Sequence, residues 1–387
     1  MAHGPDARVP ASYGAPIGVL REVPHDPRDG APHGYVDEAP HRGGGREHRP
    51  SPPGASGHSV VKPAPVPPLD PELGAVLAAF AGAAGGPLTP ENLAARQARD
   101  AATRPRPTVD DLCDGGRFEV AEIRVPGLSG APDVTLVSAR PAASTGELPL
   151  LYYLHGGGLV SGNAWSVLPR LLREWAAPLG LAVVSAEYRL APGTRYPGAL
   201  EDCAAGLGWV RSHAGALGID QDRVVVGGKS AGGGLAAALA LRTRDRGERA
   251  PAGQLLLCPM LDDRGHTFSS SQMDGTDTWD RTSGATAWQA YLGDRYGAAD
   301  LPAHAAPARA TDLSALPPAY LDVGSAETLR DEVVAYAQTL WRSGGRAELH
   351  VWPGAFHGFD THAPRAVLSQ EARDTRTRWL RRVLFPA

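Results

Sequence analysis

The sequence predicts an α/β fold in which a mostly parallel, doubly wound sheet carries helices on both faces. Near-continuous apolar runs recur at residues 148–154, 181–185, 224–226, 255–257, 320–323 and 349–352. Segments with helical spacing separate them, such as Ala199 to Val210 and Asp331 to Ser343, the second of which is followed by two glycines. Strands buried on both faces read as continuous apolar runs, and their alternation with helices is typical of a parallel sheet.

The overall composition restricts the class of partner. The 387 residues suit one large α/β domain with a lid or tail, and 38 Lys and Arg are balanced by 42 Asp and Glu. The formal charge of -4 offers no electrostatic footprint for nucleic acid or an anionic membrane, so we expect a small-molecule partner. No apolar run could span a bilayer and the N-terminus lacks a signal-like apolar core, which predicts a cytoplasmic protein without stable membrane insertion.

Three scattered cysteines, Cys113, Cys203 and Cys258, complete the composition. Their odd number argues against a disulfide framework, and their spacing matches no metal site. We interpret them as small apolar side chains of the core. The sequence therefore predicts no metal site.

Residues 1–68 are predicted to form a disordered tail. They hold 14 of the 36 prolines and six of the 13 histidines, but only two aromatic residues. Such a segment cannot bury enough apolar area to offset the entropy of ordering it. The irregular spacing of its histidines favours an extension without function over a metal-binding tract.

Ordered structure is expected to begin with two short helices. Asp70-Pro71 places an N-cap before a proline at the first helical position, and Thr89-Pro90 repeats this signal. From about residue 117 the apolar pattern changes to period two, which predicts opening antiparallel strands. The segment 262–300 fits no sheet element, so with the helices of 69–110 it is a candidate cap over a pocket; packing helices are the alternative.

The sharpest local motif is Gly228-Lys229-Ser230-Ala231-Gly232, which follows an apolar strand and precedes an Ala- and Leu-rich helical segment. A serine on a tight strand-to-helix turn is the arrangement of a nucleophile elbow. The turn strains the serine backbone, and side chains two residues before or after it would clash, so glycine is needed there. Because such a motif also arises by chance in a chain with 47 glycines, its strand–turn–helix context carries the prediction of Ser230 as nucleophile.

A second glycine motif, His155-Gly156-Gly157-Gly158, directly follows another apolar strand. Glycines let backbone amides turn toward a carbonyl oxygen on which negative charge develops. We predict Gly156 and Gly157 as two such donors and the amide of Ala231, at a helix N-terminus, as the third. A flexible loop without this role is the alternative, and His155 itself is interpreted as a loop anchor.

The general base is predicted to be His357, in a loop five residues past the strand that ends at Trp352. Its competitors are His350, which falls inside the strand pattern, and His304 and His362, which lie in weaker contexts.

The acid that orients the base is predicted to be Glu327, just past the strand 320–323. Asp331 and Glu332 are rivals, but we expect them to open the next helix, where acidic side chains stabilise the N-terminal dipole. The resulting order of serine, acid and histidine is the order that strand-to-helix nucleophiles of this type require.

Together these motifs resemble the bacterial hormone-sensitive-lipase-like carboxylesterases of the α/β-hydrolase superfamily. The similarity runs from about residue 70 to the C-terminus and includes Tyr188 to Pro192, Leu200 to Cys203 and Pro353 to Phe359, in the order of the family. It implies an α/β-hydrolase fold with a helical cap, and a catalytic domain over residues 69–387 in which Tyr188 to Pro192 and Asp202 are structural. It also implies a triad and an oxyanion hole, formed respectively by Ser230, Glu327 and His357 and by Gly156, Gly157 and Ala231.

Two positions depart from the family pattern. Glu327 stands where many members have Asp, a change that the family tolerates because either carboxylate can orient an imidazole. Lys229 precedes the nucleophile, where an acidic or small residue is more usual. A solvated or ion-paired lysine is one interpretation; a modest effect on an acidic substrate or on the histidine pKa is the other.

The resemblance predicts a serine carboxylesterase that hydrolyses small or short-chain esters through an acyl-enzyme, without a metal or organic cofactor. A lactonase, amidase or acyltransferase of a specialised pathway would use the same triad, because the pocket selects the acceptor. A ligand-binding protein on this fold is disfavoured because all three triad residues are present. A homodimer stays open, and Trp165, Trp279 and Trp288 are candidates for the pocket wall, with core or surface positions as the alternative.

Overall fold

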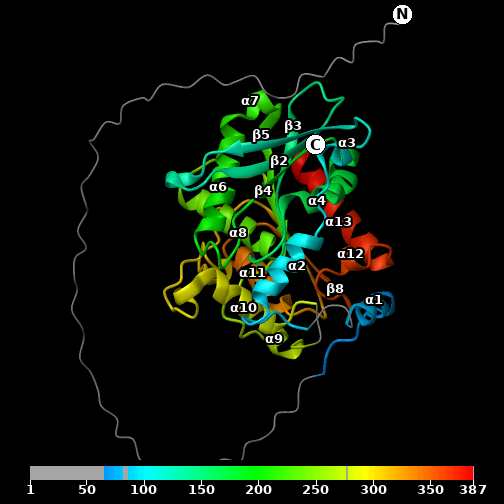
Figure 1. Cartoon of the computed structure of the whole chain (residues 1–387), viewed down its shortest axis with the longest axis vertical. Helices are drawn as coiled ribbons and strands as arrows, with labels where there is room; N and C mark the ends of the chain where they lie inside the picture. Colours follow the sequence, from blue (N-terminus) through cyan, green and yellow to red (C-terminus); the bar gives the residue numbers. More distant parts are fainter. Residues whose placement is uncertain (1–64, 82–85, 276–277, 387) are drawn as a thin grey trace, which may run out of the picture. The chain divides into compact units, whose positions relative to one another are not determined.

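The computed structural model describes residues 65–386 except 82–85 and 276–277. The described residues belong to one compact unit, which is the part of the chain drawn in colour in Figure 1. The tail predicted for residues 1–68 lies, apart from its last four residues, outside the described residues.

The sheet of this unit has eight strands in the order β1-β2-β4-β3-β5-β6-β7-β8. β2 pairs antiparallel with both of its neighbours, β1 and β4, and the pairs from β4 to β8 are parallel. The prediction of a mostly parallel sheet with antiparallel opening strands is therefore confirmed. The strands are β1 (Phe118–Val125), β2 (Val134–Pro141), β3 (Leu148–Leu154), β4 (Ala182–Glu187), β5 (Ile219–Lys229), β6 (Gly253–Leu257), β7 (Ala319–Gly324) and β8 (Ala347–Trp352).

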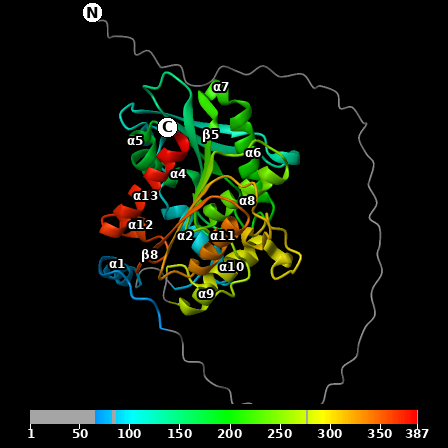
Figure 2. The ribbon, with the colours of Figure 1, turned by 180° about the vertical axis from the view of Figure 1, so that it is seen from behind.

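Helices cover both faces of the sheet (Figures 1 and 2). On β3, Leu150 and Tyr152 pack into one core cluster, and Leu151 and Tyr153 pack into the other, because successive side chains of a strand point to opposite faces. The first face carries α6 (Gly198–Ser212), α8 (Ala231–Asp245) and α11 (Arg330–Arg342). The second carries α4 (Ala164–Leu171), the π-helical turn Leu172–Ala176 and α13 (Val367–Leu384).

The central helix α8 is buried on nearly all sides, which its small residues allow. A Cβ at Gly234 would lie 2.1 Å from the carbonyl oxygen of Met260, and a Cβ at Gly233 would lie 2.9 Å from Pro259. Glycine at both positions therefore lets α8 approach the chain that leaves β6. This close packing fixes the N-terminus of α8, where the predicted nucleophile lies.

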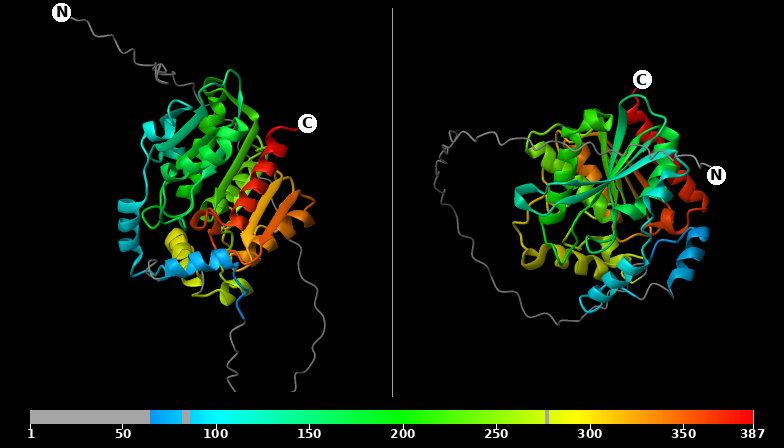
Figure 3. Two further views of the ribbon diagram at one scale, coloured as in Figure 1. Left: turned by 90° about the vertical axis from the view of Figure 1, so that its right-hand side faces the viewer. Right: turned by 45° about the horizontal axis from the view of Figure 1, so that its top comes forward.

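The two segments predicted as a cap form short helices that gather at one end of the sheet (Figure 3). They are α1 (Pro71–Ala81), α2 (Leu93–Thr103), α9 (Phe268–Gln272) and α10 (Arg281–Leu292), whereas α3 (Val109–Cys113) packs against β1. The amide of Leu88 donates to Ser283 Oγ (2.9 Å), and Thr286 Oγ1 donates to the Leu88 carbonyl (3.0 Å). The segment that precedes α2 is therefore hydrogen-bonded to α10.

The starts of the first two helices follow from their capping residues. Asp70 Oδ1 accepts from the amides of Glu72 and Leu73 at 3.0 and 3.1 Å, so α1 begins at Pro71 as predicted. At Thr89-Pro90, Asn92 Oδ1 accepts from the amide of Thr89 at 2.9 Å and the Thr89 carbonyl accepts from the amide of Leu93 at 3.0 Å, so Thr89 caps the turn that leads into α2, whose regular helix is counted from Leu93.

The remaining α-helices are single turns, α5 (Ala177–Leu179), α7 (Ala214–Leu217) and α12 (Phe359–His362). Three 3₁₀ turns span Leu128–Gly130, Gly293–Arg295 and Pro307–Arg309. Among the residues that the structure describes, no helix has both the length and the apolar character needed to cross a bilayer.

Candidate active site

Ser230 lies on the turn between β5 and α8, in a strained backbone conformation with φ 56° and ψ −123°. The turn is held by the Ser230 amide, which donates to the Leu257 carbonyl at 2.8 Å. A Cβ at Gly232 would lie 2.1 Å from the Leu154 carbonyl oxygen, and a Cβ at Gly228 would lie 2.3 Å from Gly232. The chain can therefore turn this tightly only with glycine at both positions.

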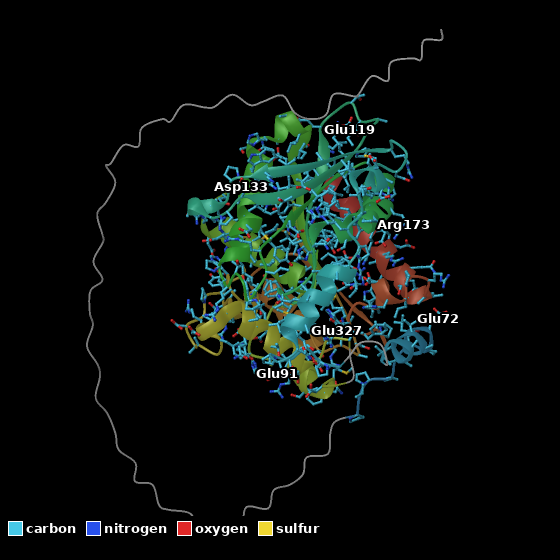
Figure 4. The ribbon with its side chains drawn as sticks, in the orientation of Figure 1. Glu72, Glu91, Glu119, Asp133, Arg173 and Glu327 are labelled. Atoms are coloured by element: carbon cyan, nitrogen blue, oxygen red, sulfur yellow. The ribbon has the colours of Figure 1, made fainter. Side chains whose placement is uncertain are left out.

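The structure brings Ser230, His357 and Glu327 into one hydrogen-bonded row. His357 Nε2 lies 3.0 Å from Ser230 Oγ, and His357 Nδ1 lies 2.6 Å from Glu327 Oε1. The other carboxylate oxygen, Oε2, accepts from the amide of Gly324 at 2.8 Å. Glu327, which is labelled in Figure 4, is fully buried, while His357 keeps 9% and Ser230 6% of its surface exposed.

Opposing influences act on the pKa of His357. Burial lowers it, but the neighbouring Cys258 and Glu327 favour the imidazolium and together raise the pKa well above its usual value. A histidine paired in this way to a buried carboxylate is stabilised in its charged form. It can therefore accept a proton from a hydroxyl at 3.0 Å.

The competing histidines lie apart from this row or have other contacts. His350 stacks between Tyr320 and Trp352 on the sheet and pairs with Glu348 at 2.9 Å. His304 Nε2 lies 2.7 Å from an oxygen of Asp245. His362 lies in α12, where burial and the nearby Lys229 lower its pKa to about 4.

The rival acids occupy the first turn of α11, where each is bonded elsewhere. Glu332 Oε1 accepts from the amides of Leu261 and Asp262 at 2.7 and 3.3 Å. Asp331 Oδ2 accepts from the amide of Ser269 at 2.7 Å. Both carboxylates therefore hold the segment that leaves β6, while only Glu327 of the three reaches His357.

The predicted oxyanion donors lie around the serine. A Cβ at Gly156 would lie 3.5 Å from Ser230 Cβ and 2.9 Å from the Lys229 carbonyl oxygen, so only glycine allows this approach. Gly157 has a φ of 126°, a conformation that side chains rarely adopt. Ala231 is the first residue of α8, where the amides have no intrahelical partner.

His155 anchors this glycine loop, in agreement with its predicted role. Its ring stacks on Tyr188 with 4.1 Å between the centroids, and the Tyr188 hydroxyl donates to the His155 carbonyl at 2.7 Å. Burial lowers the pKa of His155 to about 4, so the ring is neutral. Next to Tyr188, Arg189 is bonded to the buried Asp202, with its Nη2 2.7 Å from Oδ1.

Lys229 forms an ion pair. Its Nζ lies 2.8 Å from Asp360 Oδ1 and 2.5 Å from Thr361 Oγ1, both in the short helix α12 that follows His357. Asp360 Oδ2 also contacts Arg170 at 2.5 Å and Arg376. The ion-paired interpretation of Lys229 therefore matches the geometry, and the pair connects the residue before Ser230 to the helix after His357.

Trp279 covers the row from the 262–300 segment. Its ring centroid lies 6.4 Å from that of His357, and a Cβ at Gly158 would lie 2.3 Å from the ring. Trp279 and Trp288 also line a cavity of about 130 Å³ together with Met260. Trp165 instead packs in the core cluster on the α4 face of the sheet.

Cys258 is a neighbour of the row that sequence reasoning missed. It directly follows β6 and interacts with His357, and its sulfur, a ring nitrogen of His357 and a carboxylate oxygen of Glu327 lie within 4.8 Å of one another. The available signal was its position at a strand end, which it shares with Glu327. All three cysteines are free, as the sequence predicts.

Comparison with known proteins identifies the class of the molecule. Residues 151–361 match the model of the α/β-hydrolase fold family, and the chain belongs to this family. Esterase LipI of Mycobacterium tuberculosis is 33% identical over 260 residues, which cover 66% of this chain and 79% of LipI. The structure titled bacterial heroin esterase superposes with a TM-score of 0.72 at 38% identity, covering 82% of this chain and 98% of that one.

Within the superfamily, the chain belongs to the bacterial branch of the hormone-sensitive-lipase-like carboxylesterases. Hormone-sensitive lipase of Ictidomys tridecemlineatus is 35% identical over 131 residues, which are 34% of this chain and 17% of that protein. The family that the sequence motifs indicated is thereby confirmed.

Proposed function

We propose that this protein is a serine carboxylesterase that hydrolyses small carboxylic esters through an acyl-enzyme. The observation that carries the proposal is the row Ser230–His357–Glu327, with contacts of 3.0 and 2.6 Å and a strained serine backbone. Its relatives are named esterases, and their chemistry is ester hydrolysis. A nucleophile hydrogen-bonded to a base that a buried acid orients is the arrangement that acyl transfer requires.

In the first half-reaction, Ser230 Oγ forms a bond to the ester carbonyl carbon while His357 Nε2 accepts its proton. The amides of Gly156, Gly157 and Ala231 donate to the carbonyl oxygen as it gains negative charge. Glu327 stabilises the imidazolium from Nδ1. The carbon–oxygen bond of the ester then breaks, and the alkoxide leaves as an alcohol with the proton from Nε2.

In the second half-reaction, His357 accepts a proton from a water molecule that attacks the acyl-enzyme. The tetrahedral intermediate collapses, the carboxylic acid leaves and Ser230 recovers its proton from the imidazolium. The donors and the acid act as in the first step, so one set of residues serves both.

The preference for small acyl groups is what the family resemblance implies, and Trp279 is the side chain that supports it here. Its ring centroid lies 6.4 Å from that of His357, and the ring also covers Gly158. The cavity of about 130 Å³ that Trp279 and Trp288 line is a neighbouring space, because Ser230, His357 and Glu327 are not part of its lining. We propose that the helices α1, α2, α9 and α10 form the cap, with Trp279 as its contact to the site.

The test is hydrolysis of p-nitrophenyl esters from acetate to decanoate by the wild type and by Ser230→Ala. We expect activity that falls with chain length, and a loss of at least about 1,000-fold in kcat for the variant. Retention of most activity by Ser230→Ala would contradict the nucleophile. Adding competing alcohol or amine acceptors to the assay separates a hydrolase from an acyltransferase through the products formed.

A further inference from the structure

We propose that Cys258, Glu327 and His357 form a site for a borderline-soft divalent cation such as Zn²⁺, and that its occupation inhibits the enzyme. Their ligand atoms, one each of sulfur, nitrogen and oxygen, lie within 4.8 Å of one another. Among the residues that the structure describes, this is the one group of three potential ligands of this kind. The inhibitory effect rests on the proposed function; the binding itself does not.

The ligand set selects the class of cation. Zn²⁺ binds thiolate, imidazole and carboxylate together, whereas Mg²⁺ and Ca²⁺ prefer oxygen ligands alone. Bond lengths of about 2.0–2.3 Å place two ligands of a tetrahedral zinc ion roughly 3.3–3.8 Å apart. The present separations therefore need to change by about an ångström, with a fourth position left for water or Ser230 Oγ.

The backbone supports these three residues at one edge of the sheet. Cys258, Glu327 and His357 follow β6, β7 and β8, which are consecutive neighbours in the sheet. The amide of Cys258 donates to the Asp322 carbonyl of β7 at 2.7 Å, and Glu327 Oε2 is held by the Gly324 amide. Ligands on rigid strand ends lose little freedom on binding a metal, which favours affinity.

Occupation of the site is incompatible with the proposed catalysis. A cation on His357 Nδ1 replaces the contact to Glu327, and a cation on Nε2 replaces the contact to Ser230. A cation on Nε2 occupies the lone pair that would accept the serine proton, and a cation on Nδ1 removes the contact that orients the imidazole. Solvent reaches the site because His357 keeps 9% and Cys258 6% of its surface exposed.

The direct test is binding of Co²⁺ to the chelator-treated full-length protein. Cobalt is a spectroscopic substitute for zinc, and a thiolate ligand gives a charge-transfer absorption band in the near ultraviolet. We expect this band in the wild type and in Cys113→Ser, a matched thiol variant outside the site, and its absence in Cys258→Ser and Cys258→Ala. A band that persists without Cys258, or no band in the wild type, would overturn the site.

The functional test is Zn²⁺ titration of ester hydrolysis, with each variant's rate divided by its own rate in excess chelator. We expect reversible inhibition of the wild type and of Cys113→Ser, and a half-inhibitory concentration at least about tenfold higher for Cys258→Ser. Equal sensitivity of all three proteins would refute an inhibitory role. If no variant hydrolyses esters, the proposed function fails, while the cobalt spectra still decide whether the site exists.

Discussion

Asp360 is the buried anion that holds together the cationic side chains behind the active site, and its neutralisation is expected to destabilise the fold. Its carboxylate is 1% exposed and contacts Lys229 at 2.8 Å, Arg170 at 2.5 Å and Arg376. Burial opposes its ionisation, but the three cations hold its pKa well below its usual value. Asp360→Asn keeps the volume of the side chain, removes the charge and replaces one of the two acceptor oxygens with an NH2 donor.

The loss of stability in Asp360→Asn can be worked out from the ion pairs that the three cations keep. Arg376 is 2% exposed and retains Asp322 at 2.6 Å, and Arg170 retains Glu174 at 3.0 Å, whereas Lys229 loses its ion-pair partner. Removing one partner of a buried ion pair costs about 3–5 kcal/mol, because the other charge stays buried. With about 2 °C per kcal/mol for a large domain, the melting temperature should fall by about 6–10 °C.

The assay is urea and thermal unfolding of Asp360→Asn at pH 7, followed by circular dichroism. The matched control is Asp222→Asn, because Asp222 pairs with Arg249 at the surface, where the two side chains are 77% and 47% exposed. Exposed pairs contribute little, so the control should shift the melting temperature by about 1 °C or less. Equal stabilities of Asp360→Asn and the control would refute a stabilising role for the buried anion.

The pH dependence gives an independent check of the same prediction. The pKa of Asp360 is depressed in the folded state, so its contribution to stability is present above the unfolded-state pKa of about 3.9. That contribution is lost as the pH falls through the lower folded-state pKa. The difference in free energy of unfolding between wild type and Asp360→Asn should therefore be constant from pH 7 to about 5 and decrease below about pH 4.

Three further predictions concern catalysis. Gly232→Ala places a Cβ 2.1 Å from the Leu154 carbonyl oxygen and should lower kcat about 100-fold, whereas Gly215→Ala, which meets nothing within 4 Å, should leave kinetics unchanged. Trp279→Ala should raise kcat/KM for p-nitrophenyl octanoate relative to p-nitrophenyl acetate by at least about tenfold, because it removes the ring that covers Gly158 and lies 6.4 Å from the His357 ring; an unchanged ratio would exclude Trp279 from the substrate pocket. Glu327→Gln should lower kcat about 10,000-fold. Glu327 helps to raise the pKa of His357, and the rate needs the neutral imidazole. In this variant the acid limb of the pH–rate profile should therefore shift to lower pH.

The sheet and the elbow could be predicted because their signals are local. The near-continuous apolar runs are typical of strands buried on both faces, and the elbow needs its two glycines within five residues of chain. The Thr89-Pro90 signal marks the first turn that leads into α2, because the Thr89 carbonyl accepts from the Leu93 amide at 3.0 Å, although regular helix is counted only from Leu93. Thr89 and Asn92 also bond to each other reciprocally, and the part of Asn92 in this cap is a contact that a Thr-Pro signal does not reveal.

The partners of charged residues could not be predicted, because they are distant in the sequence. Lys229 stood out as unusual, but its partner Asp360 lies 131 residues further along. Glu332 fits the N-terminal turn of a helix, yet it is buried and bonded to two amides of the chain that leaves β6. The sequence predicts the position of such a residue in its helix, whereas tertiary packing decides what its side chain contacts.

Cys258 shows what topology adds to sequence motifs. In a parallel sheet the carboxyl ends of all strands meet at one edge, so the residues that follow β5, β6, β7 and β8 become neighbours in strand order. Three of these four positions carry Ser230, Glu327 and His357, and the position after β6 is Cys258. The first three match a known constellation, whereas the residue type of the cysteine alone indicates a position in the core. The strand order alone places a thiol between the serine and the acid, and the proposed cation site depends on this placement of Cys258.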